Sequence, residues 1–225
     1  MAGITSTMSI AKDALLAHQV AIQVTGHNVA NVDTPGYTRQ TLNLTTANPV
    51  PSRVGPIGSG VFADYIQRHY DQFTTQRIME QNSLMESLGA QMESLQLVET
   101  TFNEASGLAL NDLFSQFWES WQGLSDNPEI LSSRQTVVQQ AELVGEQLNS
   151  MMDQIAQSRY DFGVSLQAAI GDVNSLTAQI ADLNIQIGAA ESGNRKANDL
   201  RDIRDVLLQE LAKLVDITYF EPSSG

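Results

Sequence analysis

The sequence contains no cysteine among its 225 residues. Disulfide bonds, thiolate nucleophiles and cysteine-ligated metals are therefore excluded. Histidine is also scarce, and the three present, His18, His27 and His69, are not at the short spacings typical of metal ligands. We therefore expect no metal site and no cofactor.

Signals for membranes and nucleic acids are missing as well. No apolar run is long enough to span a bilayer, and residues 1–25 lack the basic start, apolar core and small-residue cleavage site of a signal peptide. The 12 Lys and Arg are outnumbered by 26 Asp and Glu, which gives a formal net charge of −14. Because nucleic acids and anionic membranes both attract basic patches, neither is expected as a partner. We expect a protein that is cytosolic or exported without cleavage.

The first 60 residues have few charges of either sign. They carry three basic and two acidic side chains, a net charge of +1, whereas residues 61–225 carry nine basic and 24 acidic side chains, a net charge of −15. A segment so poor in charge is badly suited to a solvated surface. We therefore expect residues 1–60 to be buried, against this chain or against another.

Residues 4–29 are predicted to form an amphipathic helix. Its apolar seam follows alternating steps of four and three, through Ile4, Met8, Ala11, Leu15, His18, Ile22, Thr25 and Val29. Such a helix is either an ordinary core helix or a coiled-coil arm that needs a partner helix, and the low charge on every side favours the arm. His18 and Thr25 are weak seam residues, so we do not expect the helix to be stable alone.

The stretch Asn28–Gln40 separates this helical period from a strand period. Pro35 disfavours helix at Thr34, because the proline ring crowds the residue before it. Pro35 and Gly36 fit the two central positions of a type II turn. An asparagine such as Asn31 can end a helix in the left-handed conformation. The pattern predicts a helix end followed by a turn.

Two short strands are predicted after the turn. Residues 37–46 and 61–68 alternate as strands do, and the proline- and glycine-rich residues 47–60 are expected to form an extended loop. Gly55–Gly60 is not a phosphate loop, because no Gly-Lys-Ser/Thr follows it.

The rest of the chain is predicted to be mainly helical. One helix runs from about residue 69 to Ser106–Gly107. A shorter helix at about 108–124 carries a cluster of aromatic residues, which we expect to be core rather than a ligand cage. Residues 129–188 keep an apolar seam almost unbroken, which predicts a rod of roughly 90 Å. An extra step of four at Ile155–Arg159 is a stutter, where supercoiling should relax.

The chain then returns along this rod. A turn is predicted at 191–194, a helix over 200–214 and a strand over 215–220. The fold class predicted is mainly α: an elongated antiparallel bundle of long, coiled-coil-like helices with a small β portion near residues 37–68 and 215–220. We divide it into an assembly helix, a turn with an extended β segment, a helical rod and the start of a further β domain, at residues 1–33, 34–68, 69–215 and 216–225. A closing strand pattern without a partner suggests that the natural protein is longer.

Catalytic chemistry is not indicated by the sequence. No Gly-x-Ser-x-Gly turn is present, and a rod offers no concave cleft for a pair of carboxylates. We expect the acidic residues at one-turn spacing to form a solvated face. Arg201 and Arg204 are expected to make exposed ion pairs with Asp202 and Asp205. We therefore predict that the protein is not an enzyme.

With helix, turn, strand and long helices in this order, the chain resembles the flagellar axial proteins, and most closely the hook-associated proteins among them. The resemblance rests on the segment between residues 28 and 40, whose matching residues are Asn28, Asn31, Thr34, Pro35, Gly36, Tyr37, Arg39 and Gln40. Further patches agree at Gly60–Arg68, at Phe114–Trp118 with Pro128 and Arg134, and at Asn198–Asp205. Rod and hook proteins share the first motif but lack the long helices of 69–188. One departure is Arg201-Asp202-Ile203-Arg204-Asp205, where the family more often has Leu-Asp-Gln-Arg-Asp.

The resemblance implies an extracellular structural protein at the hook–filament junction, exported by the flagellar type III route with an export chaperone. It implies a ring of about eleven copies, with hook protein and the next hook-associated protein as partners. The assembly surface would comprise the motif residues above together with Ile4, Met8, Leu15, Ile22 and Val29. The family's C-terminal helix, which pairs with the N-terminal one, is absent here, so we expect residues 1–225 alone to be monomeric.

Two alternatives stay open. The chain is also compatible with a flagellar rod or hook subunit. A secreted coiled-coil adhesin or effector would explain the rod equally well, but it would not explain the motif at Asn31–Gln40.

Overall fold

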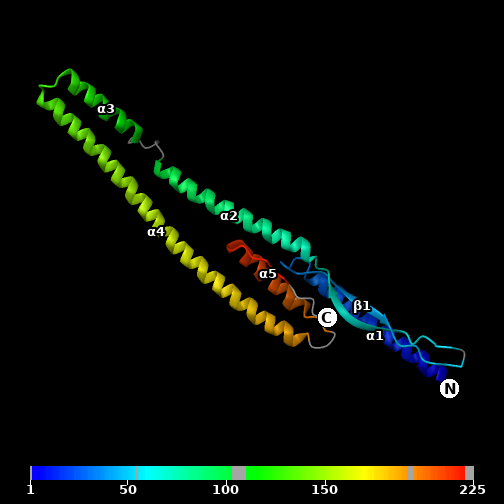
Figure 1. The fold of residues 1–225 in the computed structure, drawn as a ribbon. Coiled ribbons are helices and arrows are strands. Elements are labelled where there is room, and N and C mark those ends of the chain that lie inside the picture. Colours follow the sequence, from blue (N-terminus) through cyan, green and yellow to red (C-terminus); the bar gives the residue numbers. More distant parts are fainter. Residues whose placement is uncertain (1, 54, 103–109, 192–194, 221–225) are drawn as a thin grey trace. The chain divides into compact units, whose positions relative to one another are not determined.

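The structure is a computed structural model that describes residues 2–53, 55–102, 110–191 and 195–220 (Figure 1). Its described elements are, in chain order, α1 (Ala2–Ala30), β1 (Gln40–Thr46), β2 (Val61–Arg68), α2 (Gln72–Phe102), α3 (Leu110–Asp126), α4 (Leu131–Ala190) and α5 (Asn198–Leu214). The mainly α fold with a small β portion at 37–68 is thus confirmed. The chain forms two compact units, residues 1–83 with 172–225 and residues 84–171. The four-part division made from the sequence stays a prediction.

In the first unit, α1 packs against the sheet through a seam that sequence analysis did not single out. The residues on this side are buried or partly buried and also follow steps of four and three: Ile10, Ala14, Ala17, Ala21, Val24 and Asn28. Ala17 and Val24 are buried, and α1 contacts both β1 and β2. Alanine has little side-chain volume, which lets a sheet approach a helix closely. The seam predicted from Ile4 to Val29 lies on another side of α1.

The predicted seam is exposed in the described structure. Ile4 is 83% exposed, Leu15 is 69% exposed and Ile22 is 72% exposed. The helix therefore combines the two interpretations left open by the sequence. One face of α1 is a core face, and the face with the larger apolar side chains is uncovered.

Strands β1 and β2 form a two-stranded antiparallel sheet. The register pairs Gln40 with Arg68 and Thr46 with Val61, with an irregularity between Asn43 and Leu44. The predicted strand at 61–68 is confirmed, whereas the first strand begins at Gln40 instead of residue 37. It starts late because the backbone before Gln40 is occupied by a turn and by contacts described below.

The other part of this unit is built around α5. Met79 of α2 is buried with Leu208 and Ala212 of α5, and Ile217 and Tyr219 pack on this cluster. The strand predicted over 215–220 is not formed. Instead, the apolar side chains of this extended segment, Ile217 and Tyr219, pack on the buried residues of α2 and α5.

The second unit contains α3 and the adjoining parts of α2 and α4. Its buried residues in the described chain are Leu113, Val137, Val144 and Met151. On α3, Phe117 makes edge-to-face contacts with Trp118 at 5.2 Å and with Trp121 at 6.3 Å between ring centroids. Trp118 and Trp121 are nevertheless 64% and 47% exposed, so the prediction of an aromatic core is wrong for them. The sequence pattern showed that the aromatic residues cluster on this helix, and it could not show whether another element covers them.

The long helix predicted at 129–188 is confirmed as α4, one helix of 60 residues. The predicted helix end at Ser106–Gly107, residues 192–194 of the turn predicted at 191–194, and the closing residues 221–225 lie outside the described residues. No helix of the described chain has the length and apolar character needed to cross a membrane.

Helix α5 begins without a side-chain cap of its own, and Glu191 takes that role. The backbone N–H of Ala197 donates to Glu191 Oε1 at 3.0 Å. Arg201, one turn further on, binds both carboxylate oxygens of Glu191, at 2.6 and 2.7 Å. This hydrogen bonding by Arg201 is the main reason that the pKa of Glu191 falls from 4.5 to about 2.

The depressed pKa predicts an acid-dependent loss of stability. Because the folded state holds Glu191 ionised, its stabilisation is complete above pH 4.5 and disappears as the pH falls through about 2. Urea unfolding of Glu191→Gln should therefore show lower stability than the parent chain at neutral pH, with the difference vanishing towards pH 2. Glu210→Gln, which removes an exposed pair with Lys213, is the control and should leave the pH profile unchanged. A difference that persists at pH 2 would contradict the assignment.

Candidate functional site

The segment between α1 and β1, which we call the joint (residues 28–40), contains the turn that the sequence predicts. The N–H of Tyr37 donates to the carbonyl of Thr34 at 3.1 Å, and Gly36 between them has φ of 79°. Positive φ at this position is the requirement of a type II turn, so Pro35 and Gly36 occupy its central positions. Asn31 does not end α1 in the left-handed conformation, since no described residue other than glycine has positive φ.

Asn31 acts through its side chain instead. Its Nδ2 donates to the carbonyl of His27 at 3.0 Å, and its Oδ1 accepts from Thr34 Oγ1 at 3.2 Å. The side chain thus satisfies a carbonyl at the end of the helix and holds the first residue of the turn.

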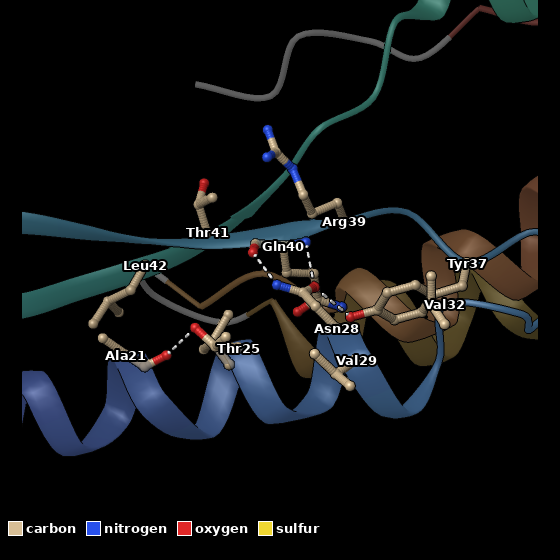
Figure 2. A pocket seen from close by; sticks show the side chains of 11 residues that line it. Ala21, Thr25, Asn28, Val29, Val32, Tyr37, Arg39, Gln40, Thr41 and Leu42 are labelled. Atoms are coloured by element: carbon tan, nitrogen blue, oxygen red, sulfur yellow. Dashed lines mark hydrogen bonds between the residues drawn. The ribbon is translucent and has the colours of Figure 1, made fainter.

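Asn28 links α1 to the first residue of β1 (Figure 2). Its Nδ2 donates to the carbonyl of Gln40, and its Oδ1 accepts from the N–H of Gln40, both at 2.8 Å. Tyr37 Oη donates to the same Oδ1 at 2.8 Å. The amide of Asn28 therefore pairs with Gln40 as the backbone of a neighbouring strand would.

Tyr37 also contacts His27. Its hydroxyl lies 3.1 Å from His27 Nδ1, and the rings meet edge-on with centroids 5.4 Å apart. A hydroxyl has one proton, and that of Tyr37 is given to Asn28, so Nδ1 of His27 carries a proton in this arrangement. Burial, with the nearby carboxylates of Asp199 and Asp202, raises the pKa of Tyr37 and keeps its hydroxyl protonated.

Helix α5 contacts the joint from the other side. Asp202 accepts from the N–H of Thr38 at 2.9 Å and from Thr38 Oγ1 at 2.7 Å. Asp199 accepts from Nε2 of Gln40 at 2.7 Å. Asn198 donates to the carbonyl of Ile66 in β2 at 2.9 Å. One face of α5 thus contacts the turn and both strands.

Arg68, at the end of β2, completes this network. Its Nη1 donates to Asp202 Oδ1 at 3.0 Å and to Asp205 Oδ2 at 2.6 Å, and the guanidinium lies 4.2 Å from the ring centre of Tyr70. Burial lowers the pKa of Arg68, but Asp205 and Asp202 outweigh burial and raise it overall. The prediction that Arg201 and Arg204 make exposed pairs with Asp202 and Asp205 is wrong.

The reason is that α5 packs its polar face inward. Asp202, Arg204 and Asp205 are 5%, 6% and 6% exposed. Arg204 binds Asn184 Oδ1 at 3.2 Å and lies 3.9 Å from Asp205. The burial of these residues could not be predicted from the sequence. Aspartates spaced three residues apart on a helix are typical of a solvated face, and the arginine that pairs with them, Arg68, comes from a distant part of the chain.

Gly36 fits against α5 with no space for a side chain. A Cβ there would lie 2.1 Å from Val206 Cγ2. Two constraints therefore require glycine at this position: the positive φ of the backbone and the close approach of α5.

The predicted site residues fall into two groups. Asn28, Asn31, Thr34, Pro35, Gly36, Tyr37 and Gln40 come together in the joint. Ile4, Met8, Leu15, Ile22 and Val29 lie along the exposed side of α1, with 83%, 73%, 69%, 72% and 68% of their surface exposed. Arg39, also in the joint, is exposed, and its carbonyl accepts from the N–H of His69 at 2.8 Å.

An open groove of about 720 Å³ lies between the end of α1 and β1 (Figure 2). Apolar side chains predominate in its lining, among them Val24, Val29, Val32 and Leu42, with Arg39 beside them. Within the described residues, no group of three or more His, Asp or Glu is placed to hold a metal ion.

Gly36→Ala should destabilise the first unit. The strained φ and the contact with Val206 together cost about 2–4 kcal/mol, measurable as a lower urea midpoint. The double variant Gly36→Ala with Val206→Ala should recover the steric part only. Gly58→Ala, at an open position without positive φ, is the control. Equal stability of Gly36→Ala and the parent chain would refute this account.

Asn28→Ala should also destabilise, by about 2–4 kcal/mol, because the buried Gln40 loses partners for its N–H and its carbonyl. Hydrogen exchange at the Gln40 amide should accelerate in parallel. Asn31→Ala, whose bonds are exposed, should cost no more than about 1 kcal/mol. If both substitutions cost the same, the pairing of Asn28 with Gln40 is not what holds the joint.

Comparison with known protein families gives two matches. Residues 95–225 match the family described as flagellar hook-associated protein FlgK helical domain. Residues 8–38, which include most of α1 and the turn of the joint, match the family described as flagella basal body rod protein.

Curated relatives agree with the first match. The chain is 32% identical to flagellar hook-associated protein 1 of Bacillus subtilis over 97% of its own length, and 29% identical to the protein of the same name from Salmonella typhimurium over 95%. It is 26% identical to that of Escherichia coli over 95%. The chain spans 44% of the length of the first relative and 39% of the other two. From the match over residues 95–225, we conclude that the chain belongs to the flagellar hook-associated protein FlgK helical domain family.

Proposed function

We propose that this chain is a structural component of the bacterial flagellum, located at the hook–filament junction, that assembles through α1. The names of its relatives support the flagellar role. The observation that carries the assembly role is the uncovered seam of α1, with Ile4, Met8, Leu15, Ile22 and Val29 exposed by 68–83%. No catalytic role is proposed.

The energetics of this seam favour a protein partner. The seam runs from Ile4 to Val29 within α1, so it extends for about 38 Å at ~1.5 Å per residue. Covering an apolar side chain of this size contributes about 1.5–3 kcal/mol. The seam has few charged neighbours. The sequence of α1 contains one Lys and one Asp, Lys12 and Asp13, and no Arg or Glu. Covering such a surface with another helix or another copy would lower its free energy in water.

The joint is suited to fix the direction in which α1 leaves the rest of the first unit. We propose a ring of about eleven copies, in contact with hook protein and with the next hook-associated protein, after export without a cleaved signal peptide and with a chaperone. Arg39, Val29 and Val32, which line the groove beside the joint, would be open to such neighbours.

A rod or hook subunit is the second candidate. The match of residues 8–38 to the basal body rod family favours it, because this segment contains most of α1. Fluorescent labelling of the whole protein in cells distinguishes the two candidates. Label at the distal end of the hook supports the junction, and label at the basal body supports the rod.

Assembly should depend on the seam. In the full-length protein, Leu15→Ser with Ile22→Ser should lower incorporation into flagella by at least about tenfold, since each loss removes about 1.5–3 kcal/mol of burial. Gln19→Ser with Gln23→Ser, exposed on the same helix, is the control and should incorporate normally. Removal of residues 1–40 should abolish export or incorporation while the helical part stays folded by circular dichroism. Normal filaments from the Leu15/Ile22 variant would refute the assembly role.

A further inference from the structure

The contact between the joint and α5 differs in character from the rest of the first unit. We call α1 with β1 and β2 the α1 hairpin, and α5 with residues 72–83 and 172–190 the α5 cluster. Between them the contacts are hydrogen bonds and ion pairs from Asn198, Asp199, Asp202 and Asp205 of α5. The apolar contribution described above is Val206 beside Gly36.

Each side keeps an apolar core of its own. The α1 hairpin buries Ala17 and Val24 between α1 and the sheet. The α5 cluster buries Met79, Leu208 and Ala212, and no residue of the α1 hairpin belongs to that core. Among the contacts described between the two sides, the apolar one is Val206 beside Gly36. Because each side has buried apolar residues of its own, each can act as a separate cooperative unit.

The connection between the two sides is short, and side-chain hydrogen bonds fix its last residue, Asp71. Residues 69–71 join β2 to α2. Asp71 directly precedes α2 and caps its first turn, because its carboxylate accepts from the N–H groups of Phe73 and Thr74 and from Thr74 Oγ1. On the other side, the N–H of His69 donates to the carbonyl of Arg39 at 2.8 Å, which ties His69 to the α1 hairpin. The bend is thereby placed at Tyr70.

From these observations we propose that Asp202 and Arg68 form a polar latch: the α1 hairpin docks on α5 through them and undocks as a folded unit about Tyr70. Asp202 is the central residue, since one carboxylate accepts from Thr38 and from Arg68. Undocking separates the charges of Arg68 from Asp202 and Asp205 and returns all of them to water. The docked state is thus specified by geometry and charge rather than by buried area. Asp202 is a positioning residue for α1.

The latch is independent of the flagellar role, because it is tested on the isolated chain. The chain has no cysteine, so Gln19→Cys on α1 and Ala181→Cys on α4 accept spin labels selectively. Both residues are exposed; Gln19 belongs to the α1 hairpin and Ala181 to the α5 cluster. Pulsed dipolar spectroscopy then reports the distance between α1 and the α5 cluster.

Asp202→Asn should add a broad distance component and raise the undocked population at least tenfold, with helix content by circular dichroism unchanged. The amide keeps the shape of Asp202 but loses its charge and one acceptor. Glu210→Gln, a carboxylate on the same helix that pairs with exposed Lys213, is the matched control and should keep the narrow distribution. A narrow distribution in Asp202→Asn would overturn the proposal, and so would broadening accompanied by loss of helix content.

A second variant tests the latch in case Asp202→Asn misfolds. Thr38→Val removes the hydroxyl that donates to Asp202 and leaves the Arg68 ion pairs in place. It should broaden the distribution less than Asp202→Asn does. Hydrogen exchange should show intact protection within β1–β2 and within α5 in both variants. Exchange that accelerates throughout the α1 hairpin would show unfolding instead of undocking and would overturn the latch.

Discussion

The carboxylate of Asp202 is the interaction on which the joint depends. It binds the backbone and hydroxyl of Thr38, two residues after the Pro35–Gly36 turn, and it also binds Arg68 at the end of β2. One carboxylate thus attaches both the segment after the turn and the second strand to α5. The direction of α1, the placement of Gly36 against Val206 and the burial of Arg68 all follow from the position of α5.

Local features of the fold were predictable because local residues cause them. The Pro35–Gly36 turn, the strand at 61–68 and the long helix α4 follow from backbone preferences and from the period of apolar residues. The role of α5 was not predictable in the same way. Asp202 and Arg68 are 134 positions apart, and a row of aspartates on a helix carries no sign of a distant arginine.

The same limit applies to α1. Two seams run along this helix, and apolar size pointed to the one from Ile4 to Val29. The sheet instead selects the seam with Ala14, Ala17 and Ala21, because small side chains permit the closer approach. The large residues of the other seam stay exposed.

The pairing of Asn28 with Gln40 has a consequence for the sheet. A two-stranded sheet has an outer edge on each strand, and unpaired N–H and carbonyl groups on such an edge are a template for strand addition and aggregation. Asn28 occupies both groups of Gln40, the first residue of β1. A foreign strand therefore finds no free hydrogen-bonding groups at this residue. A side chain from the last turn of α1 thus also protects the beginning of β1.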